Sequence, residues 1–254
     1  MPEVSIIVTI TRYWALEKLF ECLDNLIVDM DTELILYLDT DDNRVINIVS
    51  DYMDGCKYNV KMSLSGNPAP SEVRIQSRRD RICENHERLK ELVSGKYIFE
   101  VEDDTIFPAN TLKELYRYIQ KDNVGFIQGV QVGRWGVRMI GAWKVNNLYD
   151  PTKIITYPFT EVNRVGNYVE GIDAGGFYCY MTRADLFKDH KFTWHDDCFG
   201  PDVVYGLELK KKGYTNQILW NLICGHNVQN KVLYPNESVR QVEYNKINNK
   251  WSLK

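Results

Sequence analysis

The segment Lys96-Tyr-Ile-Phe-Glu-Val-Glu-Asp-Asp-Thr105 is an apolar run that ends abruptly in three consecutive acidic residues. Its aromatic and β-branched residues predict a strand over residues 97–101. In open α/β sheets, ligands collect outside the carboxyl ends of the strands. Three carboxylates at such an end repel one another unless they share a cation, and hard oxygen ligands suit Mg²⁺ or Mn²⁺ on a diphosphate. A solvated acidic turn is the alternative for this fragment alone.

Strand-like and helix-like hydrophobic periods alternate around this segment in the first half of the chain. The expected strands cover residues 4–10, 33–38 and 58–64, and the expected helices cover residues 14–27, 45–53, 75–93 and 111–120. The first strand is almost continuously apolar, as in strands that are covered on both faces. This order, with right-handed crossovers, predicts an α/β fold with a doubly wound, mostly parallel sheet.

The second half of the chain is less regular. We expect strands and turns over residues 125–141, a long connection without a clear period over 144–171, a strand over 177–181, a helix over 201–212 and a strand over 215–223. No linker or repeat separates the two halves. The sequence therefore predicts one domain over residues 1–230, followed by a polar C-terminal tail over residues 231–254.

Bulk composition excludes several classes of protein. A chain of 254 residues with 44% hydrophobic and 26% charged residues suits one large domain with a sizeable core. A net charge of −4 gives no general attraction to nucleic acid or to an anionic membrane. There is no apolar run of about 20 residues that would predict a membrane span, and no basic n-region of a signal peptide. The scattered cysteines are typical of free thiols. We therefore expect a cytoplasmic protein.

The order and spacing of several motifs resemble a GT-A glycosyltransferase of the inverting, family-two-like group. The motifs are Val4-Ser-Ile-Ile-Val-Thr-Ile10, Tyr37-Leu-Asp39, Val101-Glu-Asp-Asp104, Gly175-Gly176-Phe177, Thr182-Arg-Ala-Asp-Leu-Phe187, Gly200-Pro-Asp202, Lys212-Gly-Tyr214 and Cys224-Gly-His226. The resemblance covers roughly residues 4–228. It implies a GT-A fold whose half at about residues 1–122 binds a nucleotide sugar, and whose irregular half at about 123–230 binds the acceptor.

The resemblance also implies a donor and metal site. Thr9 and Asp39 would line the nucleoside pocket, and Glu102 would lie near the ribose. Asp104 would bind Mn²⁺ or Mg²⁺ on the diphosphate, with His226 near the metal. The first acid of this motif is Glu102, where the family more often has Asp.

Three further residues are candidates for donor binding. Asp103 lies between the other two acids of the segment. Arg78 and Arg81 belong to the basic cluster on the helix that precedes the acidic strand, and they are the best placed to point toward phosphates. The alternative for this cluster is a solvated face paired with the acidic residues of the same helix.

The catalytic base is expected after the second Gly-rich motif. The resemblance implies Asp202, which opens the helix over residues 201–212. Asp197 and Asp196 are alternatives, because Gly-Pro-Asp replaces the usual Glu-Asp pair at this point. A carboxylate base can accept the proton of an attacking hydroxyl, and one base suffices for inversion by direct displacement.

The resemblance implies a metal-dependent inverting glycosyltransferase that moves a hexosyl or pentosyl group from a nucleotide diphosphate sugar, by default a UDP-sugar, to an acceptor hydroxyl. Saccharide, lipid and protein acceptors are open, and a modified DNA base is a minority alternative because the chain is acidic. A sugar nucleotidyltransferase is a second hypothesis, although Thr9-Ile-Thr-Arg-Tyr13 lacks the glycine of a phosphate loop. A non-catalytic nucleotide-binding domain is a third, which the Gly-Pro-Asp departure motivates.

Overall fold

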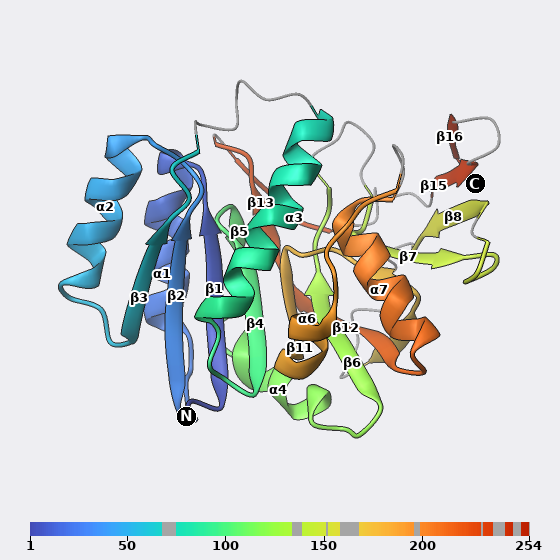
Figure 1. Cartoon of the computed structure of the whole chain (residues 1–254), viewed down its shortest axis with the longest axis horizontal. Helices are drawn as coiled ribbons and strands as arrows, with labels where there is room; N and C mark the ends of the chain where they lie inside the picture. The colour runs from blue at the N-terminus through green and yellow to red at the C-terminus, as the bar shows by residue number, and fades with distance from the viewer. Residues whose placement is uncertain are drawn as a thin grey trace.

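The computed structural model describes residues 1–67, 75–133, 139–150, 152–157, 168–195, 199–229, 231–235, 242–245 and 250–253. A central eight-stranded sheet with helices on both faces dominates the fold (Figure 1). Its strands are β1 (Val4–Ile10), β2 (Thr32–Leu38), β3 (Asn59–Leu64), β4 (Tyr97–Glu102), β6 (Val124–Val130), β9 (Val169–Ile172), β11 (Cys179–Arg183) and β12 (Thr215–Ile223).

The central sheet has the order β3-β2-β1-β4-β11-β6-β12-β9. β11 pairs antiparallel with both of its neighbours, and β9 pairs antiparallel with β12. The remaining pairs, from β3 to β4 and between β6 and β12, are parallel. The expected mostly parallel α/β sheet is therefore confirmed.

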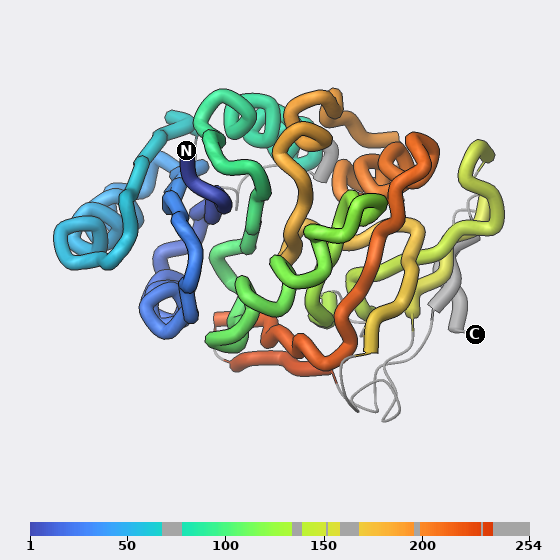
Figure 2. The backbone as a smooth tube through the Cα atoms, turned by 90° about the horizontal axis from the view of Figure 1, so that it is seen from below, coloured from blue at the N-terminus to red at the C-terminus, as the bar shows by residue number. Residues whose placement is uncertain are grey.

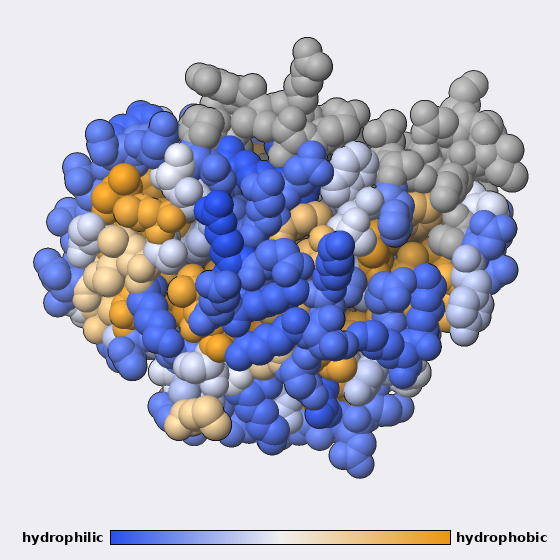
Figure 3. Space-filling model, viewed as in Figure 1, coloured by the Kyte–Doolittle hydropathy of each residue, from blue (hydrophilic) through white to orange (hydrophobic). Residues whose placement is uncertain are grey.

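Two layers of helices cover this sheet because its strands are apolar on both faces. Ile6 and Val8 point to the core beneath α1 (Leu16–Asn25), α2 (Asn43–Met53) and α4 (Thr111–Ile119). Ile7 points to the core beneath α3 (Ile75–Leu92), α6 (Ala184–Asp189) and α7 (Pro201–Lys211). The latter three helices lie in front of the sheet in Figure 1 and above it in Figure 2. The outer surface over α3 is hydrophilic (Figure 3).

The expectation of a long connection without a clear period over residues 144–171 is wrong where the structure describes strands in this range. β7 (Ala142–Val145) and β8 (Lys153–Thr156) form a second sheet with β10 (Ala174–Gly175), β15 (Val242–Asn245) and β16 (Lys250–Leu253), in the order β10-β7-β8-β15-β16. β9 also lies in the range that was expected to be irregular. Each of these strands has at most four residues, which is too few to establish a period of two in the sequence.

The strand expected over residues 177–181 begins two residues later, at Cys179. A turn precedes it, because the Gly176 N–H donates to Gln128 Oε1 at 2.9 Å. Gln128 Nε2 also donates to the hydroxyl of Tyr178 at 2.7 Å. The Tyr178 carbonyl still accepts from the Glu102 N–H at 3.1 Å, so the pairing with β4 extends by one hydrogen bond beyond Cys179.

A third, short sheet connects the acidic segment to the end of β12. It contains β5 (Thr105–Ile106), β13 (Gly225–Asn227) and β14 (Val232–Leu233), in the order β14-β13-β5. His226 is in register with Thr105, and the Asn227 N–H donates to the Asp104 carbonyl at 2.8 Å. This pairing places His226 beside the acids that follow β4. Among the helices that the structure describes, none has the length and apolar character needed to cross a membrane.

Candidate active site

The carboxyl ends of β1, β2 and β4 bring four predicted donor-site residues to one edge of the central sheet. Thr9 on β1 is in register with Glu102 on β4, so the two half-buried side chains point to the same face. Asp39 follows β2 directly, and Asp104 lies two residues beyond β4. Thr9 Oγ1 is buried and has no hydrogen-bond partner within the described ranges.

Asp39 and Arg81, predicted independently as donor-site residues, form a buried ion pair. Arg81 Nε lies 3.0 Å from Asp39 Oδ1 and 2.9 Å from Oδ2, and the Arg81 Nη2 donates to Oδ1 at 2.9 Å. Asn67 Nδ2 also donates to Oδ1, at 3.0 Å. Arg81 thus leaves the solvated face of α3, whereas Arg78, on the same helix, has an exposed side chain.

Asp103 connects the end of β4 to the loop that follows β1. Its Oδ2 accepts from the Thr11 N–H at 2.6 Å, from Thr11 Oγ1 at 3.0 Å and from the Arg12 N–H at 2.9 Å. Its Oδ1 accepts from the Arg12 guanidinium. The side chain is buried. These contacts show that Asp103 stabilises the loop at the carboxyl end of β1.

Asp104 and His226 form a buried pair that fits a divalent cation. His226 Nε2 lies 3.4 Å from Asp104 Oδ2, and the two side chains are 4% and 0% exposed. His226 Nδ1 lies 2.8 Å from the Val132 carbonyl oxygen, which can only accept, so Nδ1 carries a proton and Nε2 faces the carboxylate. This separation fits two ligands of one ion, which at usual bond lengths are roughly 3.0–3.5 Å apart.

Arg12 is a site residue that sequence analysis missed. Its Nη1 lies 3.2 Å from Asp104 Oδ2, in addition to its contact with Asp103. Arg12 comes two residues after the end of β1. Its position after the carboxyl end of an expected strand is the signal in the sequence that points to this role.

A metal ion at Asp104 and His226 would take its other ligands from outside the protein. Within the part of the chain that the structure describes, no group of three or more His, Cys, Asp or Glu side chains is placed to hold a metal ion. Magnesium-like cations are commonly held by one or two carboxylates, the phosphates of a substrate and water. The residues present therefore fit a cation that enters with a diphosphate.

Asp202 is the second residue of α7, directly after Pro201. Its Oδ1 accepts from the Val203 N–H at 2.9 Å, and its side chain is half-buried. Burial raises the pKa of the Asp202 carboxyl to about 6, against the opposing effect of backbone N–H groups and the positive charges of Arg79 and His86. A carboxylate with such a pKa can accept a proton near neutral pH. The alternatives at residues 196 and 197 (Asp196 and Asp197) lie outside the described residues.

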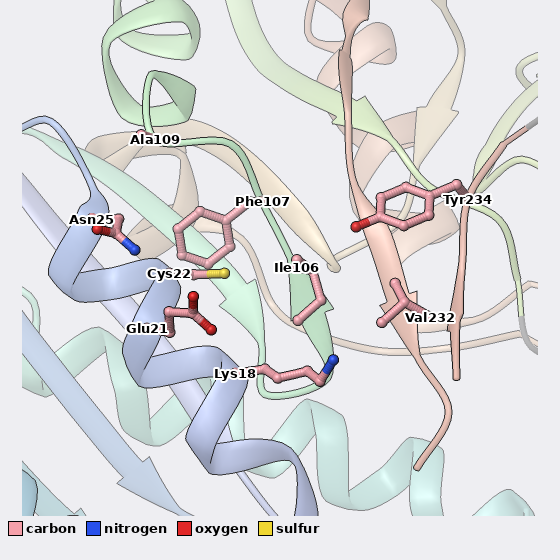
Figure 4. Close-up of a pocket in the computed structure, with 9 residues that line it drawn as sticks. All are labelled: Lys18, Glu21, Cys22, Asn25, Ile106, Phe107, Ala109, Val232 and Tyr234. Carbon is pink, nitrogen blue, oxygen red and sulfur yellow. The ribbon is translucent and has the colours of Figure 1, made fainter. Parts of the chain in front are cut away.

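A pocket of about 460 Å³ lies between α1 and the short sheet (Figure 4). Figure 4 shows polar side chains of α1 along one wall and apolar and aromatic side chains of the short sheet and its flanks along the other. The lining includes Lys18, Glu21, Cys22, Phe107, Val232 and Tyr234. No predicted site residue lines this pocket, so it is distinct from the candidate active site.

The sequence matches no protein-family model and no curated protein. Similar solved structures include the mannosyltransferase PcManGT from Pyrobaculum calidifontis in complex with GDP-Man and Mn²⁺, with a TM-score of 0.56 and 11% identity, covering 85% of this chain and 54% of that chain. They also include residues 1–349 of TarS from S. aureus, with a TM-score of 0.51 and 15% identity, covering 91% of this chain and 59% of that chain. The chain thus spans little more than half the length of these structures. The expected GT-A-like fold is confirmed.

Proposed function

We propose that this chain is a metal-dependent inverting glycosyltransferase that moves a hexosyl or pentosyl group from a nucleotide diphosphate sugar to an acceptor hydroxyl. The observation that carries the proposal is the buried Asp104–His226 pair, with 3.4 Å between Oδ2 and Nε2, at the strand ends of a GT-A-like sheet. PcManGT, which shares this fold, binds GDP-Man and Mn²⁺. The cysteines that the structure describes are free thiols, which are typical of proteins in a reducing compartment such as the cytoplasm.

The metal would neutralise the negative charge that develops on the leaving diphosphate. Asp104 and His226 would hold it, and the imidazole ligand favours Mn²⁺ over Mg²⁺, which prefers oxygen ligands. Arg12 adds a fixed positive charge at the same position, because its guanidinium already lies against Asp104. Glu102, beside Thr9, would face the ribose.

Asp202 would act as the base. The acceptor hydroxyl transfers its proton to the Asp202 carboxylate while its oxygen forms a bond to the anomeric carbon of the sugar. The bond from that carbon to the diphosphate breaks, and its electron pair leaves with the nucleoside diphosphate. One displacement on the face opposite the leaving group inverts the anomeric configuration. The partly exposed position of Asp202 at the start of α7 supports access for an acceptor.

The Asp39–Arg81 pair favours a uridine donor over a guanosine donor. Guanine presents two N–H donors that a carboxylate binds with both of its oxygens, whereas uracil presents one N–H between two carbonyl acceptors. Asp39 Oδ1 already accepts from Asn67 and from two nitrogens of Arg81. Oδ2 already faces Arg81 Nε at 2.9 Å. Each carboxylate oxygen has about two lone-pair sites, so Oδ2 keeps capacity for a single N–H of the base.

Thermal unfolding with and without Mn²⁺ tests the proposed function. A nucleotide at about 100 times its Kd stabilises the native state by about 2.7 kcal/mol, which raises Tm by roughly 5–10 °C for a chain of this size. We expect this shift with UDP and Mn²⁺ together, and a smaller one with GDP and Mn²⁺. If no nucleoside diphosphate raises Tm in Mn²⁺ or Mg²⁺, the proposal is wrong. UDP-sugars are then screened for metal-dependent release of UDP.

Asp39→Asn is expected to weaken UDP binding by about 1–3 kcal/mol, because it removes the charge from a buried hydrogen-bond acceptor. The rate at saturating donor should change less, since this contact exists before and during transfer. Calorimetric titration of UDP in saturating Mn²⁺ measures the effect. Asp41→Asn is the matched control, because Asp41 is exposed two residues away. Equal affinities in the two variants would restrict Asp39 to a structural role.

A further inference from the structure

Arg12 and His226 meet at one carboxylate oxygen of Asp104. Arg12 Nη1 lies 3.2 Å from Asp104 Oδ2, and His226 Nε2 lies 3.4 Å from the same oxygen. The Arg12 guanidinium also donates to Oδ1 of Asp103. The oxygen that is a candidate ligand of the cation therefore already faces a permanent positive charge.

The backbone of Arg12 is held independently of its side chain. Asp103 Oδ2 accepts from the N–H groups of Thr11 and Arg12 at 2.6 and 2.9 Å. The side chain of Arg12 is 26% exposed, whereas those of Asp103 and Asp104 are 1% and 0% exposed. The Arg12 side chain thus contacts two buried carboxylates and keeps an accessible part, so it can exchange partners without a change in the loop that carries it.

A divalent cation at Asp104 and His226 would share a carboxylate oxygen with this guanidinium. Two positive charges that are so close together in a buried position repel each other more strongly than they would in water. A diphosphate relieves the repulsion, because its negative oxygens attract the cation and also accept hydrogen bonds from Arg12. A guanidinium suits this second role, since its parallel N–H groups match the geometry of phosphate oxygens.

We propose that Arg12 makes metal binding depend on the donor. Its guanidinium competes with the cation for Asp104, and it transfers its hydrogen bonds from Asp104 to the diphosphate when cation and nucleotide bind together. This role rests on the proposed function, which supplies the nucleotide. The cation and the nucleotide should strengthen each other's binding by the same factor, as linkage requires, and Arg12 should account for part of that factor.

The test is a cycle of Mn²⁺ and UDP affinities, measured by calorimetric titration of wild type and Arg12→Gln. We expect Arg12→Gln to bind Mn²⁺ alone about 10-fold more tightly, since it removes a like charge from the site. It should bind UDP in saturating Mn²⁺ about 10-fold more weakly, because the diphosphate loses a charged hydrogen-bond donor. UDP binding without a metal ion should be unchanged, because the guanidinium then stays on Asp104.

The coupling between the two ligands decides between competition and a static charge. In Arg12→Gln, the factor by which Mn²⁺ and UDP strengthen each other's binding should fall by about 10-fold. A guanidinium that stayed on Asp104 throughout would weaken Mn²⁺ binding equally with and without UDP. An unchanged coupling factor, or Mn²⁺ alone binding no more tightly than in wild type, would therefore overturn the inference. Arg12→Met, which keeps an aliphatic side chain, gives the same readout if Arg12→Gln does not fold.

Arg183→Gln is the matched control. Arg183 pairs with Asp185 at the surface. It is in register with Tyr97 at the start of β4, whereas Asp104 follows the end of that strand. The control removes the same charge from the opposite edge of the sheet, and both affinities should equal those of wild type.

Asp104→Asn in the Arg12→Gln background locates the cation. The gain in Mn²⁺ affinity should disappear in the double variant, because both substitutions act on one contact. A gain that persists would show that Arg12 does not act through Asp104 and would overturn the inference.

The same measurements separate this inference from the proposed function. If Mn²⁺ and UDP strengthen each other's binding in wild type and the coupling factor is the same in Arg12→Gln, the inference alone is overturned. If wild type does not bind UDP in Mn²⁺ but Arg12→Gln binds Mn²⁺ more tightly, competition at Asp104 is supported and the nucleotide-sugar function is contradicted. A reduced coupling factor in a protein that releases UDP from UDP-sugars supports both.

Discussion

Asp104→Asn is expected to lower sugar transfer by about 10³-fold or more, equivalent to about 4 kcal/mol of lost transition-state stabilisation, and to remove the effect of Mn²⁺ on nucleotide binding. The amide keeps the shape of the side chain but cannot supply the negative charge that faces His226 Nε2 at 3.4 Å. The fold should persist, because Arg12 keeps its contact with Asp103 when the charge of Asp104 is removed. Titration of Mn²⁺ in the presence of UDP measures the loss.

Asp122→Asn is the control for this prediction. It removes the same charge from an exposed position after α4 and should change neither metal binding nor transfer. Mn²⁺-dependent UDP binding that survives in Asp104→Asn would show that the cation lies elsewhere. The pH dependence gives a second check, because a histidine must be neutral to bind a metal ion, so the cation should bind more weakly in acid.

The sequence predicted the position of the three acids correctly but could not predict how they divide their contacts. An apolar run that ends in Glu102, Asp103 and Asp104 places them at a strand end, as the structure has them. Each side chain then leaves the backbone in a different direction. Glu102 lies beside Thr9 across the strands, Asp103 binds the loop after β1, and Asp104 faces His226. These directions depend on neighbours that are distant in sequence.

Pairings between distant segments account for the other features that sequence patterns missed. His226 comes beside Asp104 through the three-stranded sheet, whose strands β5 and β14 have two residues each and carry no periodic signal. Arg81 appears in the sequence as one of several charged residues on a polar helix, and only the position of α3 over the sheet shows that it is buried against Asp39. β1 was placed to within one residue because its apolar run is local, and α7 was placed as closely because Pro201 and Gly213 mark its two ends.

Asp202→Asn is the second substitution with a large expected effect. It preserves the Oδ1 atom that accepts from the Val203 N–H, so the start of α7 should be unchanged. It removes the group that takes the acceptor proton, and we expect transfer to fall on the order of 10²-fold or more while UDP and Mn²⁺ still bind. Asp185→Asn is the matched control, because Asp185 also lies in the first turn of a helix but pairs with Arg183 at the surface. Near-normal transfer in Asp202→Asn would move the base to Asp196 or Asp197.

The pH dependence of transfer and of stability checks the same assignment in the wild-type protein. This test does not depend on a loss of activity alone. Burial raises the pKa of Asp202 from its ordinary value to about 6, so kcat/KM should rise with pH through about 6 as the base ionises.

The contribution of Asp202 to the free energy of unfolding changes with pH in the opposite direction. A carboxyl whose pKa is higher in the folded state than in the unfolded chain binds its proton more tightly when the protein is folded. Its contribution to stability is therefore complete below the unfolded pKa near 4. This contribution is lost as pH rises through about 6. Asp202→Asn cannot ionise, and its Tm relative to wild type should therefore increase between pH 4 and pH 7.5. A carboxylate in a half-buried site lowers stability at the pH where it acts as the base, which is the expected cost of its place in catalysis. A Tm difference that does not change with pH would contradict the raised pKa on which this assignment depends.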